Sequence, residues 1–136
     1  MFTNELRIGN IIEFCNFIQP KRFVTVDARF FCSMAAGRSI KPDEEINNYY
    51  SPVFLTPEIL NKCGFEFITD WTVKGNDGVS YRKDLGWLKL EVGMMSTYIV
   101  TLVDKNGFST GVNIEYLHQL QNIYFTLTQT ELQINL

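Results

Sequence analysis

The side chains best suited to chemistry in this sequence are one histidine and three cysteines. A nucleophile activated by histidine would have to use His118 together with Cys15, Cys32, Cys63 or a serine brought close by the fold. The sequence contains no Gly-x-Ser-x-Gly nucleophile elbow. A zinc site needs paired ligands at short spacing, which one histidine and three scattered cysteines do not provide. We therefore expect no catalytic residue, no metal site and no cofactor, and we interpret His118 as a structural or partner-contacting residue.

Two polar segments have the composition of ligand sites but lack the required pattern. The carboxylates of Asp43–Glu45 could attract a cation, but a run of acids in a loop is usually solvated. Gly75–Gly78 is rich in glycine but lacks the lysine and the strand-loop-helix context of a phosphate-binding loop. Both segments are therefore interpreted as solvent-exposed loops or turns.

Basic residues that lie beside aromatic ones can bind single-stranded nucleic acid by charge and stacking. One such group comprises Arg82, Lys83 and Trp87, and Lys21 and Arg22 form a second basic patch in the first predicted turn. The formal net charge of the chain is −3, whereas general DNA binding needs a basic face. We do not expect nucleic-acid binding, but we retain it as an alternative function.

A long helical pattern near the end of the chain must position several of these candidates. Apolar residues recur from Ile114 to Thr128 with a helical period of about 100° per residue. The apolar stripe is too wide for a surface helix, and Asn113 could cap its start. His118 and Gln121 interrupt the apolar residues, so both need hydrogen-bond partners. Strands of the same chain could provide them, which we prefer, or a second chain could do so across an interface.

The remaining pattern predicts an antiparallel α+β fold. An N-terminal hairpin, from Leu6 to Val26, resembles in pattern the hairpin that opens small SH3-like barrels. A β-meander follows, and together the strands are expected to form a curved sheet packed on the long C-terminal helix. Two short helices are expected after the caps Asp27 and Thr56, ended by Gly37 and Gly64. Arg38 to Ser51 is expected to be a loop. The meander strands are predicted at residues 65–69, 72–74, 79–83, 88–92, 98–103 and 108–112, with an edge strand at 132–136.

Length and composition limit the number of domains and the cellular location that we expect for the protein. A chain of 136 residues has the size of one domain, so we expect a single domain over residues 1–136. Met1–Arg7 is polar, unlike a signal peptide, and no segment approaches the roughly 18 apolar residues of a membrane span. The odd number of cysteines argues against a disulfide framework. We therefore expect a cytoplasmic protein without membrane contact.

Three stretches of the sequence resemble one group of proteins. They are Asn4–Asn10 (NELRIGN), Pro52–Phe65, which contains LTPEIL, and Tyr116–Thr128, which begins YLHQLQNIYF. These motifs are similar to those of small uncharacterised proteins encoded in gut Bacteroidetes genomes, often in prophage or mobile-element neighbourhoods. Members of that group often have a glycine after the long helix, where this chain has Gln129. The resemblance implies a cytoplasmic protein of mobile-element origin, and no known activity, cofactor or site residue.

The absence of a catalytic motif and the breadth of the apolar helix favour a small non-enzymatic interaction module. Its partner would be an unknown protein or a second copy of the chain. A nucleic-acid-associated accessory protein is the first alternative, and an enzyme with an unrecognised site is the second. The candidate interaction residues are His118, Gln121, Lys21, Arg22, Arg82, Lys83 and Trp87.

Overall fold

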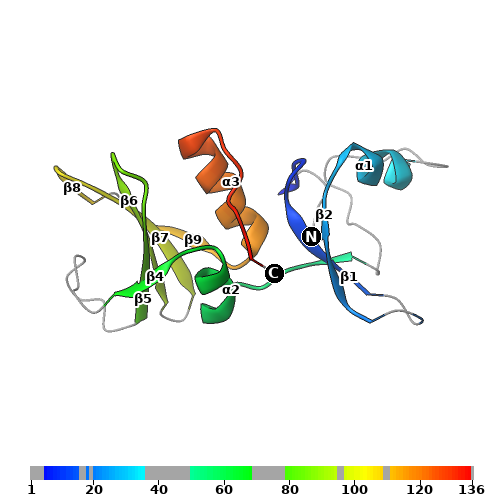
Figure 1. The fold of residues 1–136 in the computed structure, drawn as a ribbon, viewed down its shortest axis with the longest axis horizontal. Coiled ribbons are helices and arrows are strands. Elements are labelled where there is room, and N and C mark those ends of the chain that lie inside the picture. The colour runs from blue at the N-terminus through cyan, green and yellow to red at the C-terminus, as the bar shows by residue number, and fades with distance from the viewer. Residues whose placement is uncertain are drawn as a thin grey trace. The chain divides into compact units, whose positions relative to one another are not determined.

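A computed structural model describes residues 5–15, 18, 20–35, 50–68, 79–94, 97–108 and 111–135. The chain divides into two compact units, each with its own antiparallel sheet (Figure 1). Unit 1 consists of Met1–Phe54 and Tyr116–Leu132, and unit 2 of Leu55–Glu115 and Gln133–Leu136. The mixed α+β class expected from the sequence is confirmed, whereas the single domain stays a prediction.

The sheet of unit 1 has three antiparallel strands in the order β2-β1-β3. The expected hairpin of β1 (Ile11–Phe14) and β2 (Arg22–Thr25) is present, with Phe14 opposite Arg22. Tyr50 and Ser51, expected at the end of a loop, instead belong to β3 (Tyr50–Pro52). This strand pairs with β1 and places the Tyr50 ring 5.2 Å from the Phe14 ring, a contact between residues too distant in sequence to be read from local pattern.

A small apolar core lies against this sheet. Leu6, Ile12 and Val26 are buried together, and half-buried aromatic rings pack around them. Two of these rings come from the helix α1 (Ala28–Ala35). Asp27 caps the start of this helix, because its carboxylate accepts a hydrogen bond of 2.8 Å from the Phe30 backbone N–H. The predicted cap is therefore confirmed. The packed rings are Phe30, Phe31 and Tyr50.

The long helix α3 (Leu117–Thr128) packs on β1 within unit 1. The prediction that it starts near Ile114 with Asn113 as its cap is wrong, because both residues pair with β7 in the other unit. The helix begins after Tyr116, whose backbone N–H donates to Gln119 Oε1 at 3.1 Å. Its buried residues are Leu117, His118, Leu120 and Gln121.

The last residues of the chain do not form the predicted edge strand. Within the described part, residues 131–135 have no strand pairing. Leu132 is buried, and the Asn135 backbone N–H donates one hydrogen bond of 3.0 Å to the Lys62 carbonyl. An alternating pattern of apolar residues is not sufficient for a strand, because a strand also needs a free sheet edge at the correct distance and register.

Unit 2 contains a six-stranded meander, with β4-β5-β6-β7-β8 in sequence order and β9 also paired with β7 (Figure 1). The predicted strand at residues 108–112 is divided in two. A Cβ atom at Gly111 would collide with the Ile99 side chain on β7, so the chain passes close to β7 at this residue.

Three predicted segments lie outside the described residues: the strand 72–74, the loop 38–49 and the turn Gly75–Gly78. The strands are β4 (Glu66–Ile68), β5 (Val79–Asp84), β6 (Lys89–Met94), β7 (Tyr98–Asp104), β8 (Gly107–Phe108) and β9 (Val112–Ile114).

A short helix precedes the meander, as the sequence predicts. Thr56 Oγ1 accepts a hydrogen bond of 3.2 Å from the Ile59 backbone N–H at the start of α2 (Pro57–Lys62). Gly64 ends the helix with φ +79°, a conformation that glycine adopts easily. The Phe65 backbone N–H then donates to the Leu60 carbonyl at 3.0 Å, and both side chains are buried. The Gly64 turn and the hydrogen bond from Phe65 to Leu60 direct the chain from α2 into β4.

Candidate interaction surface

The first basic patch, in unit 1, is occupied by contacts within its own hairpin. Lys21 Nζ lies 3.1 Å from Glu13 Oε2. The Arg22 guanidinium carbon lies 5.2 Å from the centroid of the Phe14 ring, within the range of a cation–π contact. The structure therefore places both side chains across the β1–β2 hairpin, where each has a partner from the same sheet.

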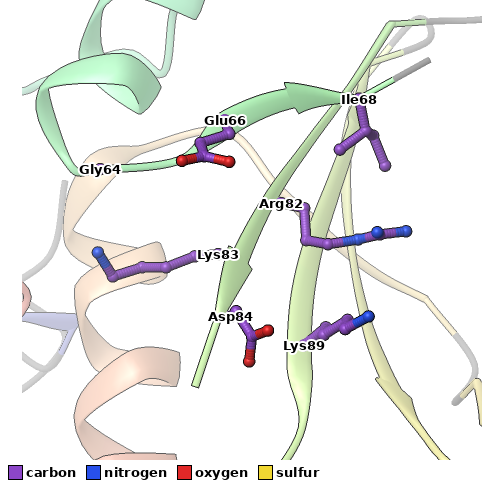
Figure 2. Close-up of a pocket in the computed structure, with 7 residues that line it drawn as sticks. All are labelled: Gly64, Glu66, Ile68, Arg82, Lys83, Asp84 and Lys89. Atoms are coloured by element: carbon purple, nitrogen blue, oxygen red, sulfur yellow. The ribbon is translucent and has the colours of Figure 1, made fainter. Parts of the chain in front are cut away.

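The second basic pair, Arg82 and Lys83, lies in unit 2 on opposite faces of β5 (Figure 2). Arg82 donates through Nε and Nη2 to Glu91 Oε1 at 2.9 and 2.5 Å, and Glu91 is only 4% exposed. Lys83 Nζ donates to the Cys63 carbonyl at 2.9 Å. Both cations therefore have partners within unit 2, and neither lines the pocket that contains Trp87.

Trp87 is the most exposed aromatic residue among the described part of the chain, at 66%. It lies in the turn between β5 and β6, which is held by two hydrogen bonds. The Gly86 backbone N–H donates to Asp84 Oδ1 at 2.8 Å, and the Leu85 N–H donates to the Leu88 carbonyl at 2.9 Å. Leu88 itself is buried and anchors the turn. The indole is therefore exposed on a turn that two hydrogen bonds and the buried Leu88 hold in place.

Two lysines that the sequence analysis did not select lie beside this indole. Lys89 and Lys105 line a pocket of about 460 Å³ together with Trp87, Leu88 and Val103. The antiparallel pairing of β6 and β7 places Lys89 directly opposite Val103, so two turns meet at one end of the meander. Neither lysine forms an ion pair with any carboxylate in the described ranges. In the sequence, only the position of Lys89 and of Lys105 beside a predicted turn could have indicated that these lysines belong to a site.

A second pocket, of about 410 Å³, opens over the polar face of β4, β5 and β6 (Figure 2). Opposite charges face each other across its strands, with Glu66 opposite Arg82 and Asp84 opposite Lys89. These pairs balance much of the charge along the pocket, so it offers no clear preference for an anion or a cation. Lys89 lines both pockets.

His118 and Gln121 lie in the core of unit 1. Gln121 Oε1 accepts from the Ile11 backbone N–H at 2.9 Å, and its Nε2 donates to the Gly9 carbonyl at 3.2 Å. These are the backbone partners within the same chain that we preferred on sequence grounds. His118 is fully buried and stacks on Tyr116, with ring centroids 5.7 Å apart.

The imidazole of His118 has no hydrogen-bond partner among the described residues. Its closest charged group is the Glu5 carboxylate, with Nε2 and Oε2 3.6 Å apart. Burial lowers the pKa of His118 below its ordinary value of 6.5, although Glu5 opposes the shift. The ring is therefore neutral at physiological pH.

The three cysteines differ in burial: Cys63 is buried, Cys15 is half-buried and Cys32 is exposed. Burial raises the pKa of the Cys63 thiol to about 11, and Lys83 lowers it only in part, so the reactive thiolate is scarce at neutral pH. Neither Cys15 nor Cys32 forms a disulfide with another described residue. The described residues contain no group of three or more His, Cys, Asp and Glu side chains that could hold a metal ion. The carboxylates Asp43–Glu45 lie outside those residues.

In the described ranges, none of the helices combines the length and the apolar character needed to cross a membrane. No protein-family model, curated protein or solved structure matches the chain.

Proposed function

We propose that this chain is a small protein-interaction module and that it binds a partner protein through the end of the meander at Trp87. The observation that carries the proposal is the 66% exposure of this indole on a turn fixed by hydrogen bonds. Tryptophan is enriched among the residues that dominate binding energies at protein interfaces. A rigid support also reduces the entropy lost on binding. The cytoplasmic location and the mobile-element origin stay predictions from sequence.

Nucleic acid is the alternative ligand that one specific observation favours, since Trp87 has two lysines beside it. An indole can stack on a base while ammonium groups pair with phosphates. Against this, Asp84 and Asp104 lie at the same end of the meander, and the chain carries a net charge of −3. We therefore rank a protein partner first.

The test is affinity capture from the source cells with wild type, Trp87→Ala and a matched control, followed by binding measurements with the purified partner. Phe67→Ala is the control because Phe67 is also an exposed aromatic residue of unit 2, at 56%. We expect a partner that wild type and Phe67→Ala retain and that Trp87→Ala binds about tenfold more weakly or worse. Equal binding by all three proteins, each with an unchanged melting temperature, would exclude Trp87 as the contact.

A further inference from the structure

We infer that Asn106 is a modification site, where the folded protein deamidates spontaneously to aspartate and isoaspartate. Lys105 and Asn106 form the turn between β7 and β8, and Asp104 pairs with Gly107 across it. Asn106 does not line the pocket that contains Trp87, Lys89 and Lys105, named here the Trp87 pocket. The reaction is therefore independent of the proposed contact at Trp87.

Asn106 is the one asparagine of the chain that glycine follows. Deamidation starts when the backbone nitrogen of the following residue bonds to the side-chain carbonyl carbon of asparagine. A side chain on that following residue crowds the approach and restricts the backbone, whereas glycine does neither. The pair Asn106–Gly107 therefore has the residue types that favour this reaction.

The Asn106 side chain is exposed and has no hydrogen bond to any described residue. Its backbone N–H donates to Asp104 Oδ1 at 2.7 Å, which holds the main chain of the turn but not the side-chain amide. A Cβ atom at Gly107 would meet no described atom within 4 Å. β8 contains only Gly107 and Phe108, and so short a strand opens locally at little cost. The turn therefore gives the Gly107 nitrogen access to the Asn106 side chain.

The reaction needs water as its only co-reactant and involves no oxidation or reduction. The Gly107 backbone nitrogen loses its proton to hydroxide or a buffer base and forms a bond to Cγ of Asn106. The bond from Cγ to the side-chain nitrogen breaks, and that nitrogen takes up a proton and leaves as ammonia, which closes a succinimide ring. Water then adds to either ring carbonyl and opens the ring. One opening gives aspartate, and the other gives isoaspartate, whose main chain runs through the side-chain carboxyl carbon.

Either product adds a negative charge to a turn whose Asp104 and Lys105 line the Trp87 pocket. Isoaspartate also adds a methylene group to the main chain between the paired residues Asp104 and Gly107. In the described chain, β8 is held to β7 through that pair and the adjacent pair of Val103 and Phe108. Deamidation therefore changes both the charge and the backbone at this end of the meander.

The experiment is incubation of the full chain in mildly alkaline buffer, at a temperature below the start of its thermal unfolding. Peptide mass spectrometry follows each asparagine, and methylation by a protein isoaspartate methyltransferase detects isoaspartate. The Asn106 peptide should be lost, with both products in its place, before Asn61 or Asn113 changes. These two asparagines are internal controls because both are exposed, but Lys62 and Ile114 follow them in place of glycine.

Asn106→Gln is the matched variant, since a glutamine side chain would have to close a larger and less favourable ring. It should take up no methyl label and keep its charge on ion exchange throughout the incubation. Equal rates at Asn106, Asn61 and Asn113 would overturn the inference. An Asn106 that deamidates in urea but not in the folded chain would overturn it too, because the native turn would then hold the reacting atoms apart.

Discussion

The Gln121 side chain of α3 completes the hydrogen bonding of the bend that leads into β1. Its Oε1 accepts from the Ile11 backbone N–H at 2.9 Å, and its Nε2 donates to the Gly9 carbonyl at 3.2 Å. One amide therefore acts as both acceptor and donor to the backbone, as a neighbouring strand would. This relationship connects the helix to the sheet of unit 1 through polar groups as well as apolar packing.

Replacing Gln121 by leucine should lower the free energy of unfolding and leave the oligomeric state unchanged. The substitution leaves the backbone N–H of the half-buried Ile11 without its acceptor, at an expected cost of about 1–3 kcal/mol. Urea unfolding measures the stability, and light scattering of wild type and variant measures the mass. A wild-type dimer that becomes a folded monomer in Gln121→Leu would identify α3 as an interface instead.

Deletion of the Leu120 side chain should destabilise the fold by about 2–5 kcal/mol, the usual range for a buried leucine. Leu120 is fully buried in α3, whereas Leu127 on the same helix is only half-buried. Leu127→Ala should therefore cost less than Leu120→Ala. Thermal melts of both variants decide the matter, and a shift within error for Leu120→Ala would mean that α3 contributes little to stability.

Stability should fall as the pH is lowered from about 7 to 5, in part because of His118. Burial lowers the pKa of the folded histidine below 6.5, so the unfolded chain binds a proton in this range that the folded chain binds less readily. The slope from one group is at most about 1.4 kcal/mol per pH unit. His118→Phe has no proton to bind and should show a shallower decrease in unfolding free energy. Identical pH profiles for both proteins would show that His118 is not responsible.

Replacing Gln129 by glycine should stabilise the protein by about 1 kcal/mol. Gln129 follows α3 with φ +56°, the left-handed conformation in which glycine is favoured and a side chain is strained. Thr130→Gly is the control because Thr130 has no positive φ, so glycine there should give no gain. A lower melting temperature for Gln129→Gly would show that the strain is already offset.

The protein should not be retained by single- or double-stranded DNA at physiological salt. Lys21, Arg22, Arg82 and Lys83 all have partners within their own units, and the net charge is negative. Gel shifts at low and moderate salt test this, because phosphate contacts weaken steeply as salt rises. A complex that persists at moderate salt and is lost in Trp87→Ala would support the nucleic-acid alternative.

The sequence by itself determined the features that depend on neighbouring residues. Asp27 and Thr56 cap their helices as predicted, and Gly64 ends the second, since each acts within one turn of the backbone. The short connection between the predicted strands 98–103 and 108–112, which joins β7 to β8, also follows from local alternation of apolar and polar residues. Trp87 was also a candidate from sequence, because its type and its place beside a turn are local properties.

Only the tertiary structure decided the pairings between residues that are distant in sequence. Ile114 fits a helical stripe, yet it pairs with Tyr98 as part of β9, because strand hydrogen bonds outweigh the local preference there. Lys105 lies beside the Trp87 pocket because of the register between β6 and β7. Gln121 faces a strand bend rather than another side chain of its helix. These relationships depend on strand register and on the approach of whole elements, which no short window of sequence specifies.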